Sequence, residues 1–414
     1  MRTLITNAEQ IFTVDTKGKN FKRGKQHSEL HSICDSAIVI ENGSVKDIIT
    51  NITAAKMDSD VRIDARNCIV LPGLIECHTH AAYSGTRANE FLMRLKGASY
   101  EEIAQSGGGI TSTMKAVRHS SFEELTKLLE PRISHFIEQG VTTLEIKSGY
   151  GLSFYDEIKQ LQVINHFRTH SPIEIIHTFL GAHTYPPEFK NDHKGYLNMI
   201  INEMLPYIIK NKLAEHLDVF CELTAFTSEE TDLIFSKAKK LGYQLRLHSE
   251  QFNNVGGIDV ALKHKALSVD HLEVLKEEDI PKFAKSETVG VILPGASFFL
   301  DCPFAPARKL IDNNGIVALS TDYNPGSSHI PNILLIMQIA ALKMKMSIEE
   351  IISAVTINAA KALGINDKTG SIEIGKQADF AIFEAKDISE IIYNIGININ
   401  RFTMKKGETV FKRN

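Results

Sequence analysis

The sequence has few cysteines and no spacing that would pair them. The five are Cys34, Cys68, Cys77, Cys221 and Cys302, an odd number without a Cys-x-x-Cys pair. This argues against a disulfide framework and favours a reducing compartment. The first ten residues lack the apolar core of a signal peptide, and no stretch approaches the ~18 uninterrupted apolar residues of a membrane-spanning helix. We therefore expect a cytoplasmic protein with no membrane partner.

Blocks of like charge are also scarce. The chain has 46 Lys and Arg against 50 Asp and Glu, and its one short basic stretch runs from Lys17 to Lys25. We interpret this stretch as a solvated loop rather than a nucleic-acid contact. Internal repeats and low-complexity segments are not evident either. The expected partner is thus a small molecule and not a nucleic acid.

Both ends of the chain look rich in β-strands. Near the start, apolar runs flank Asn42-Gly43, which is a strong hairpin signal. Near the end, a second hairpin is expected around Lys406-Gly407. We predict that residues 1–65 and 370–414 together form one small β-sandwich-like domain.

The middle of the chain, residues 66–369, alternates short apolar runs with helical patterns. Near-continuous apolar runs are typical of parallel strands that are buried on both faces. The eight runs are Ile69–Ile75, Val141–Ile146, Ile173–Leu180, Leu217–Cys221, Tyr243–Leu247, Ala266–Val269, Val289–Leu293 and Ile316–Leu319. Helical segments lie between them, including Phe122–Gln139, which we expect Pro131 to interrupt, and stretches after the capping boxes Thr227/Glu230 and Ser347/Glu350. This α/β pattern predicts a (β/α)8 TIM-like barrel, with an open doubly wound sheet as the alternative.

Four potential metal ligands follow the predicted strands. His78 and His80 come after the first, two residues apart, and in extended backbone they project to the same side. His248 ends the fifth strand and Asp322 follows the eighth. Active sites of such barrels lie at the carboxyl ends of the strands. Three imidazoles and one carboxylate can hold Zn²⁺ or Fe²⁺ with a position left for water, so we predict one such ion per subunit.

Two of the residues at this rim could move protons. Asp322 could bind the metal and also take a proton from an activated water, and His271, at the end of the sixth strand, could hydrogen-bond a substrate carbonyl or assist proton transfer. A buried structural role for His271 remains the alternative. We assign both residues to catalysis.

Further polar residues at the rim could bind a substrate. An arginine there could form a fork onto a carboxylate, and a tyrosine between two glycines lies where backbone can approach a ligand. Backbone amides without a partner in the loop after Asp322, and side chains there, could bind a carboxylate or a ring carbonyl. Each candidate has a structural alternative. Arg87 could form a surface salt bridge, Tyr150 could pack on the rim, and His183 could be exposed to solvent. The loop after Asp322 could be a simple Pro-Gly turn. The candidates are Arg87, Tyr150, His183, Asn324, Gly326 and Ser327.

Several segments resemble a known superfamily. Val70–Ile75 ahead of His78-x-His80 is similar to the start of the amidohydrolase barrel, and Gly370–Phe383 is similar to its return into the β-domain. Within that superfamily, Glu145–Gly151, Asp218–Glu222 and Ser320–Ser327 resemble the imidazolonepropionase family. The resemblance covers nearly the whole chain.

The resemblance implies a metal-dependent hydrolase that opens the ring of 4-imidazolone-5-propanoate, a small anion, to N-formimidoyl-L-glutamate in histidine degradation. It implies the same four metal ligands and substrate residues, and it adds Gln251 and, less firmly, Tyr100. The pattern that resembles deaminases of the superfamily is His-x-x-Glu after the fifth strand. This chain has His248-Ser-Glu-Gln251 there, with glutamine in place of the glutamate. Gln251 cannot shuttle a proton, which favours ring opening.

Several alternatives stay open. If Glu250 turned inward, a heterocycle deaminase would fit, and Glu222 at the end of the fourth strand leaves room for a second metal. A non-catalytic relative that acts as a binding protein is the third possibility, although all four ligands are present. Exposed barrel helices are compatible with a homodimer.

Overall fold

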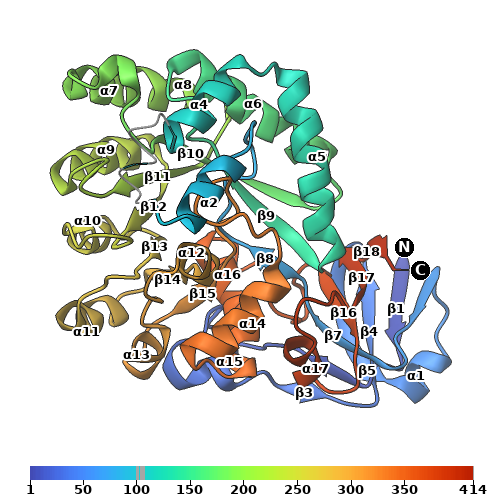
Figure 1. Cartoon of the computed structure of the whole chain (residues 1–414). Coiled ribbons are helices and arrows are strands. Elements are labelled where there is room, and N and C mark those ends of the chain that lie inside the picture. The colour runs from blue at the N-terminus through green and yellow to red at the C-terminus, as the bar shows by residue number, and fades with distance from the viewer. Residues whose placement is uncertain (99–101, 103–107, 414) are drawn as a thin grey trace.

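The computed structural model, which describes residues 1–98, 102 and 108–413, contains one large barrel flanked by two smaller sheets (Figure 1). Eight parallel strands form the barrel in chain order, as predicted, and their helices lie outside them. The strands are β8 (Leu74–Glu76), β9 (Val141–Lys147), β10 (Glu174–Ala182), β11 (His216–Cys221), β12 (Gln244–Ser249), β13 (Ser268–His271), β14 (Val289–Ile292) and β15 (Val317–Leu319).

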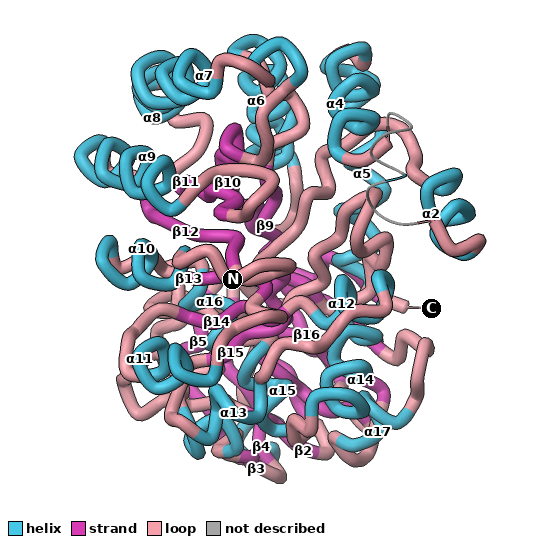
Figure 2. The backbone as a smooth tube through the Cα atoms, turned by 60° about the vertical axis from the view of Figure 1, so that its left-hand side comes forward, coloured by secondary structure: helices cyan, strands magenta, loops and turns pink. Residues whose placement is uncertain are grey.

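The helices follow the strands in the alternation expected of a (β/α)8 barrel. Figure 2 shows them as an outer layer around the strands. They include α2 (Ala88–Leu95), α4 (Ile110–His119), α5 (Phe122–Glu138), α6 (Phe154–His170), α7 (His193–Met199), α8 (Leu205–Lys210), α9 (Ser228–Leu241), α10 (Gly257–His264), α11 (Ile280–Ala284), α12 (Pro294–Leu300), α13 (Ala307–Asp312), α14 (Ile333–Met344), α15 (Ile348–Ala354) and α16 (Ile357–Ala362). The capping boxes predicted at Thr227 and Ser347 begin α9 and α15.

One expectation was wrong, because α5 runs through Pro131 without a break. The buried Leu129 and Ile133 on either side outweigh the ~3 kcal/mol cost of an internal proline.

The two flanking sheets draw on both chain ends. One has the order β5-β4-β1-β6, and the other has the order β18-β17-β16-β7-β2-β3. Their strands are β1 (Arg2–Thr6), β2 (Gln10–Phe12), β3 (Ser32–Ile33), β4 (Ser36–Glu41), β5 (Ser44–Thr50), β6 (Val61–Asp64), β7 (Cys68–Pro72), β16 (Phe380–Glu384), β17 (Asn400–Lys405) and β18 (Glu408–Lys412). Both predicted hairpins form, between β4 and β5 and between β17 and β18. A separate apolar cluster that includes Ile5, Ile38, Val70 and Phe380 packs among these sheets.

The run Ile69–Ile75, predicted as one barrel strand, is two strands. β7 pairs with β16 and β2 in the flanking sheet, and only β8 joins the barrel. The change occurs at Gly73, where a Cβ atom would lie 2.2 Å from Oγ1 of Thr142. The strand pairing therefore carries the flanking sheets beyond residue 65, and the domain division at that residue stays a prediction.

The barrel closes at the rim that carries the candidate site. His80 N donates to Tyr323 O at 2.9 Å, and Thr79 and Tyr323 form an isolated parallel bridge. Below them, the hydroxyl of Ser320 donates to the buried carboxyl of Glu76. The residues after β8 and β15 are thus fixed against one another by the closure of the barrel itself.

Within the segment from Asp15 to Ser32, Lys17, Lys19 and Lys25 are exposed, as expected of a solvated loop, but other residues of the segment pack against the barrel. Lys22 is buried, and its ammonium donates to the carbonyls of Asp15 and Glu29. His27 is fully buried against the start of β15, where its Nε2 accepts from Val317 N at 3.2 Å and from Asn358 Nδ2 at 2.9 Å. These contacts hold the segment against the amino-terminal end of β15.

We expect His27 to make the protein less stable in acid. Burial lowers the pKa of His27 from 6.5 to about 4, so the unfolded chain takes up a proton first as the pH falls. Stability from this group is complete above pH 6.5 and is lost between pH 6.5 and 4, by ~3 kcal/mol in total. Urea unfolding of wild type and His27→Asn at several pH values would test this. The variant should lose less stability over that interval, and parallel pH curves would contradict the assignment.

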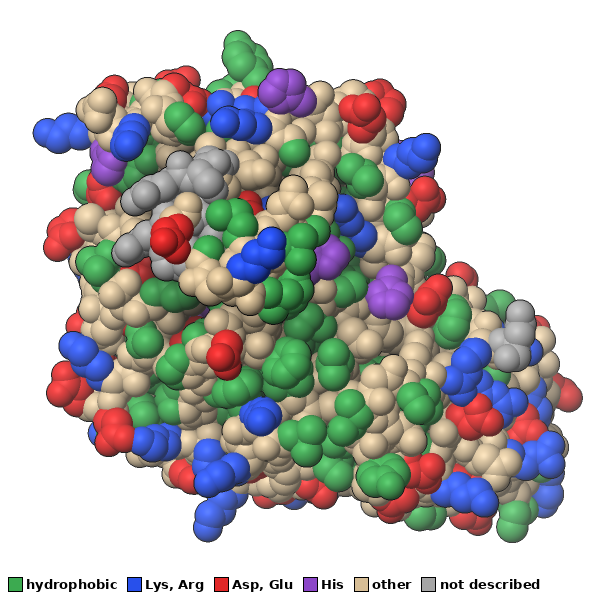
Figure 3. All heavy atoms as spheres, viewed as in Figure 1, with side chains coloured by type: hydrophobic (Ala, Val, Ile, Leu, Met, Phe, Trp, Pro, Cys, Tyr) green, Lys and Arg blue, Asp and Glu red, His purple; other side chains and the backbone are tan. Residues whose placement is uncertain are grey.

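No helix in the described part of the chain is long and apolar enough to span a membrane. Lys, Arg, Asp and Glu side chains alternate on the face drawn in Figure 3, without a block of one sign. All five cysteines lie among the described residues, and none is in a disulfide.

Candidate active site

The predicted site residues come together around a cavity at the carboxyl ends of the barrel strands. The cavity has a volume of about 80 Å³, and its lining includes His80, His248, His271 and Asp322. Its wall includes Arg87, Tyr150, His183, Gln251, Asn324, Gly326 and Ser327. All seven predicted substrate residues thus border one space. Tyr100, the additional candidate, lies outside the described residues.

The four candidate metal ligands converge on one point. Nε2 of His78 lies 3.4 Å from Oδ1 of Asp322, and Nε2 of His80 lies 3.5 Å from the same oxygen. Nε2 of His248 lies 3.3 Å from Nε2 of His80. His271 also comes close enough to His78 and His248 to share an ion with them. The residues reach this point because each follows or ends a parallel strand of the closed barrel, at the same end.

The donor atoms fit a divalent cation. Burial lowers the pKa of His78, His80 and His248, with a further contribution from nearby cations for His78, so these imidazoles are neutral. A neutral imidazole offers one lone pair, and within the described part of the protein Nε2 of His78 is buried without a hydrogen-bond partner. Three such nitrogens beside a carboxylate are a donor set suited to Zn²⁺ or Fe²⁺.

Buried charges that the sequence analysis missed orient these imidazoles. Nδ1 of His78 lies 2.6 Å from Oδ2 of Asp270, and Nδ1 of His248 lies 3.0 Å from Oδ2 of Asp218. Arg246 donates to Asp270 at 2.8 Å, and Nζ of Lys147 lies 2.9 Å from Asp218. Carboxylates behind metal-binding histidines fix the ring orientation and its tautomer. The available signal was a charged residue inside an apolar strand run, as for Asp218 and Arg246, or directly after one, as for Lys147 and Asp270.

The two proposed proton-transfer groups have pKa values near neutrality. Burial raises the pKa of Asp322 to about 7, and His271 lowers it only in part. Burial opposes the charging of His271, but the carboxylate of Glu273, 3.3 Å from its Nδ1, raises the pKa of His271 to about 8. His271 has φ 88°, an unfavourable conformation for a non-glycine residue, which turns the chain at the end of β13. Both groups can exchange protons at physiological pH.

The loop after Asp322 is arranged by Asn324. Its Oδ1 accepts from the amides of Gly326 and Ser327 at 2.8 Å each, and its Nδ2 donates to Asp322 O at 2.7 Å. The expectation that amides in this loop are free for a ligand was therefore wrong for Gly326 and Ser327. The hydroxyl of Ser327, which borders the cavity, is 3.4 Å from Oδ2 of Asp322.

Arg87 reaches the cavity from the start of α2. Its guanidinium pairs with Glu90, at 2.8 Å from Nε and 2.7 Å from the terminal nitrogen, so the pair is not an exposed surface bridge. A Cβ atom on Gly326 would lie 1.9 Å from a terminal nitrogen of Arg87. A side chain at position 326 would therefore displace the guanidinium of Arg87 from the loop of Asp322.

Tyr150 and His183 also line the cavity and are buried. His183 donates from Nδ1 to Gly149 O at 3.0 Å, which leaves its Nε2 as an acceptor. The amides of Gly149, Gly151 and Leu152 all donate to the buried carboxyl of Glu157 on α6. The glycines around Tyr150 therefore allow the backbone to wrap around a carboxylate of the protein rather than a ligand.

The structure separates Gln251 from Glu250. Gln251 borders the cavity, whereas Glu250, with φ 57°, accepts from the hydroxyl of Ser249 and is not among the lining residues. Glu222 accepts from the amides of Leu223, Phe252 and Asn253 with both of its oxygens, and it belongs to none of the possible metal-binding groups among the described residues. The arrangement that a deaminase would need from Glu250 is absent, and Glu222 anchors the loop that carries Gln251.

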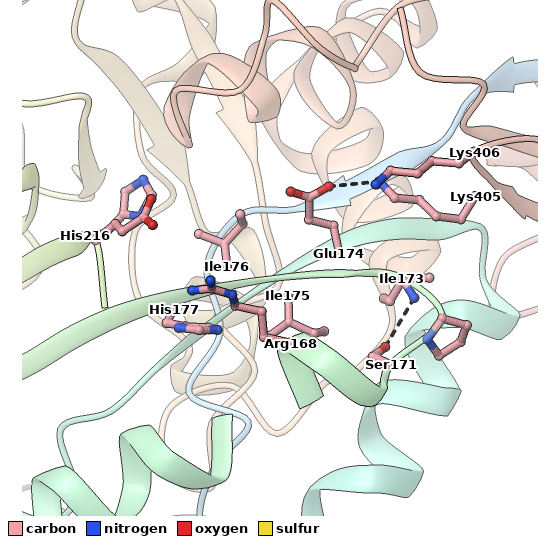
Figure 4. A pocket seen from close by; sticks show the side chains of 12 residues that line it. Arg168, Ser171, Ile173, Glu174, Ile175, Ile176, His177, His216, Lys405 and Lys406 are labelled. Carbon is pink, nitrogen blue, oxygen red and sulfur yellow. Dashed lines mark hydrogen bonds and ion pairs between the residues drawn. The ribbon is translucent and has the colours of Figure 1, made fainter. Parts of the chain in front are cut away.

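A larger cavity, of about 430 Å³, opens at the opposite ends of the strands (Figure 4). Glu174 and Lys405 pair across it at 3.4 Å, and His177 and His216 donate to backbone carbonyls. Catalytic groups of such barrels come from the carboxyl ends of strands, and this cavity lies at the amino-terminal ends. It is distinct from the candidate site.

Comparison with known proteins agrees with this arrangement. The model of the amidohydrolase family matches residues 69–410. An imidazolonepropionase of Thermoanaerobacter pseudethanolicus is 41% identical, covering 98% of this chain and 97% of that protein. One of Christiangramia forsetii is also 41% identical, covering 96% and 97%. A zinc-bound adenosine deaminase from Xanthomonas campestris shares the fold, with a TM-score of 0.73 and 17% identity over 98% of this chain and 92% of that one. The chain belongs to the amidohydrolase family and, within it, to the imidazolonepropionases.

Proposed function

We propose that the protein hydrolyses 4-imidazolone-5-propanoate to N-formimidoyl-L-glutamate, a step of histidine degradation in the cytoplasm. The observation that carries the proposal is the 41% identity to an imidazolonepropionase over 98% of the chain. In this reaction the oxygen of water bonds to the ring carbonyl carbon, and the bond from that carbon to the adjacent ring nitrogen breaks. The nitrogen gains a proton, and the former carbonyl becomes a carboxylate.

The proposed metal ligands are His78, His80, His248 and Asp322, which would hold one Zn²⁺ or iron ion per subunit. Such an ion, when bound, lowers the pKa of water to about 7 and polarises a carbonyl group. The chain's own contribution is to keep the three imidazoles neutral by burial and oriented by Asp218 and Asp270.

Asp322 and His271 are the proposed proton carriers. The carboxyl of Asp322 borders the cavity and can accept the proton of the attacking water. With a pKa of about 8, His271 is mostly protonated there and can donate to the carbonyl oxygen. The proton on Asp322 can then pass to the departing ring nitrogen.

The cavity wall supplies the proposed substrate contacts. Nε2 of His183 can accept from a ring N–H, and the amide of Gln251 can both donate to and accept from the ring. Arg87 offers a cation to the propionate, while Tyr150, Asn324, Gly326 and Ser327 complete the wall. Gln251 cannot act as the proton shuttle of a deaminase.

The direct test is to purify the protein, quantify its bound metal, and follow the ultraviolet absorbance of freshly made imidazolonepropanoate. We expect accelerated loss of absorbance that stops when a chelator removes the metal, with formimidoylglutamate as the product. A metal-loaded protein that leaves this substrate intact would overturn the substrate assignment. Ammonia release from aminated heterocycles would then indicate a deaminase, and an absence of metal uptake would indicate a binding protein.

A further inference from the structure

Helix α2 brings a second arginine to the cavity, which the sequence analysis did not single out. Arg87 stands at the start of α2 and Arg94 in its last turn, seven residues later, and both line the cavity. Seven residues are two helical turns, so both side chains leave the same face of the helix. The two cations therefore approach the space in front of Asp322 together.

The charges of these two arginines differ in how they are balanced. Glu90 accepts from Arg87, and its other oxygen accepts from Gly109 N at 3.0 Å. Arg94 forms no ion pair with any carboxylate in the described part of the chain. Arg87, Glu90 and Arg94 together thus carry one excess positive charge at the cavity wall.

Arg94 is held in place but keeps hydrogen-bonding capacity. Its terminal nitrogen donates to Gly326 O at 3.1 Å, and its guanidinium lies 4.9 Å from the ring of Phe299. Phe299 in turn stacks on Phe91 of α2 with ring centroids 5.1 Å apart. A guanidinium has five N–H donors, of which this carbonyl uses one. Aromatic faces and partial burial limit its hydration, which strengthens its attraction for an anion.

We propose that Arg94 binds the carboxylate of the substrate together with Arg87 and thereby selects an anionic ring substituent over a neutral one. The inference rests on the proposed function, because it takes the propionate as the anion. The single excess positive charge matches the single negative charge of that substrate. Since Arg94 also holds Gly326 O, a bound carboxylate would lie next to the loop that carries Asp322.

The alternative role for Arg94 is a mechanical one, in which it only ties α2 to the loop of Asp322. The two roles differ in their kinetic signature. A contact made equally in the ground state and the transition state raises KM and leaves kcat unchanged. A mechanical tie would instead disturb Asp322 and lower kcat for every substrate, whether charged or neutral.

The experiment compares Arg94→Gln and Arg94→Lys with the metal-loaded wild type on imidazolonepropanoate and on the neutral analogue 5-methyl-4-imidazolone. For Arg94→Gln we expect KM for the anionic substrate to rise about 10- to 100-fold with kcat nearly unchanged, as for loss of a charged hydrogen bond. The kcat/KM for the neutral analogue should stay the same. Arg94→Lys should recover part of the affinity, and Lys96→Gln, on the exposed end of the same helix, is the matched control.

The outcomes separate this inference from the proposed function. Wild type that turns over neither compound would refute the function, and calorimetry with 3-(imidazol-4-yl)propanoate against 4-methylimidazole would still test the anion site. An unchanged KM in Arg94→Gln, or an equal loss with both substrates, would overturn the role of Arg94. Thermal unfolding of each variant shows whether a loss comes from misfolding.

Discussion

His248→Ala should lose its metal and at least ~10³-fold of its ring-opening rate. His248 supplies one of three neutral imidazoles that converge with Asp322, and its Nε2 lies 3.3 Å from that of His80. Removing it leaves two histidines and a carboxylate, too few protein ligands for tight binding of Zn²⁺. It also leaves Asp218 without the imidazole at 3.0 Å that helps to hold its pKa well below the usual range against the effect of burial. Without the ion, the pKa of the attacking water is not lowered toward neutrality. The rate of ring opening therefore falls.

The measurement is metal content by elemental analysis beside the rate of absorbance loss. His264→Ala is the matched control, because His264 bonds Asp232 at 2.7 Å on the outer side of the barrel. That variant should keep both its metal and its activity. A His248→Ala protein with full metal content and wild-type turnover would refute the proposed ligand set.

Lys147→Met should destabilise the protein by ~3–5 kcal/mol, the usual cost of breaking a buried ion pair from one side. Nζ of Lys147 is fully buried, 2.7 Å from Glu145, 2.9 Å from Asp218 and 3.9 Å from Asp270. Without this cation, Arg246 alone would face three buried carboxylates. Two of those carboxylates orient His78 and His248, so metal affinity should also fall, about 10- to 100-fold.

Urea unfolding at pH 7 gives the change in the free energy of unfolding, and competition with a chelator gives the metal affinity. Lys309→Met is the matched control, since Lys309 pairs with Glu277 and both side chains are more than half exposed. We expect that variant to lose less than ~1 kcal/mol. A loss of similar size in the two variants would show that the buried network contributes no more than a surface pair.

The sequence by itself determined the barrel and the rim on which the site stands. Apolar runs mark strands because a parallel strand buried on both faces needs apolar side chains throughout, and this information is local. The capping box at Thr227 and the turn at Asn42-Gly43 are also local signals, each contained in a few consecutive residues. Once the strands are placed in order, His78, His80, His248 and Asp322 must fall at one end, because all strands of the barrel are parallel. The convergence of the candidate site was therefore predictable.

Only the tertiary structure decided how those side chains are supported and charged. The contact of His78 with Asp270 joins residues 192 positions apart, and the contact of Arg94 with Gly326 joins residues 232 apart. No local pattern encodes such pairs, because they depend on how the barrel closes and on which buried charges compensate one another. The choice between Glu250 and Gln251 is likewise tertiary, since a φ of 57° at Glu250 leaves Gln251 on the cavity wall. A strand end predicts which residues reach the rim, and packing around each residue decides which of them face the substrate.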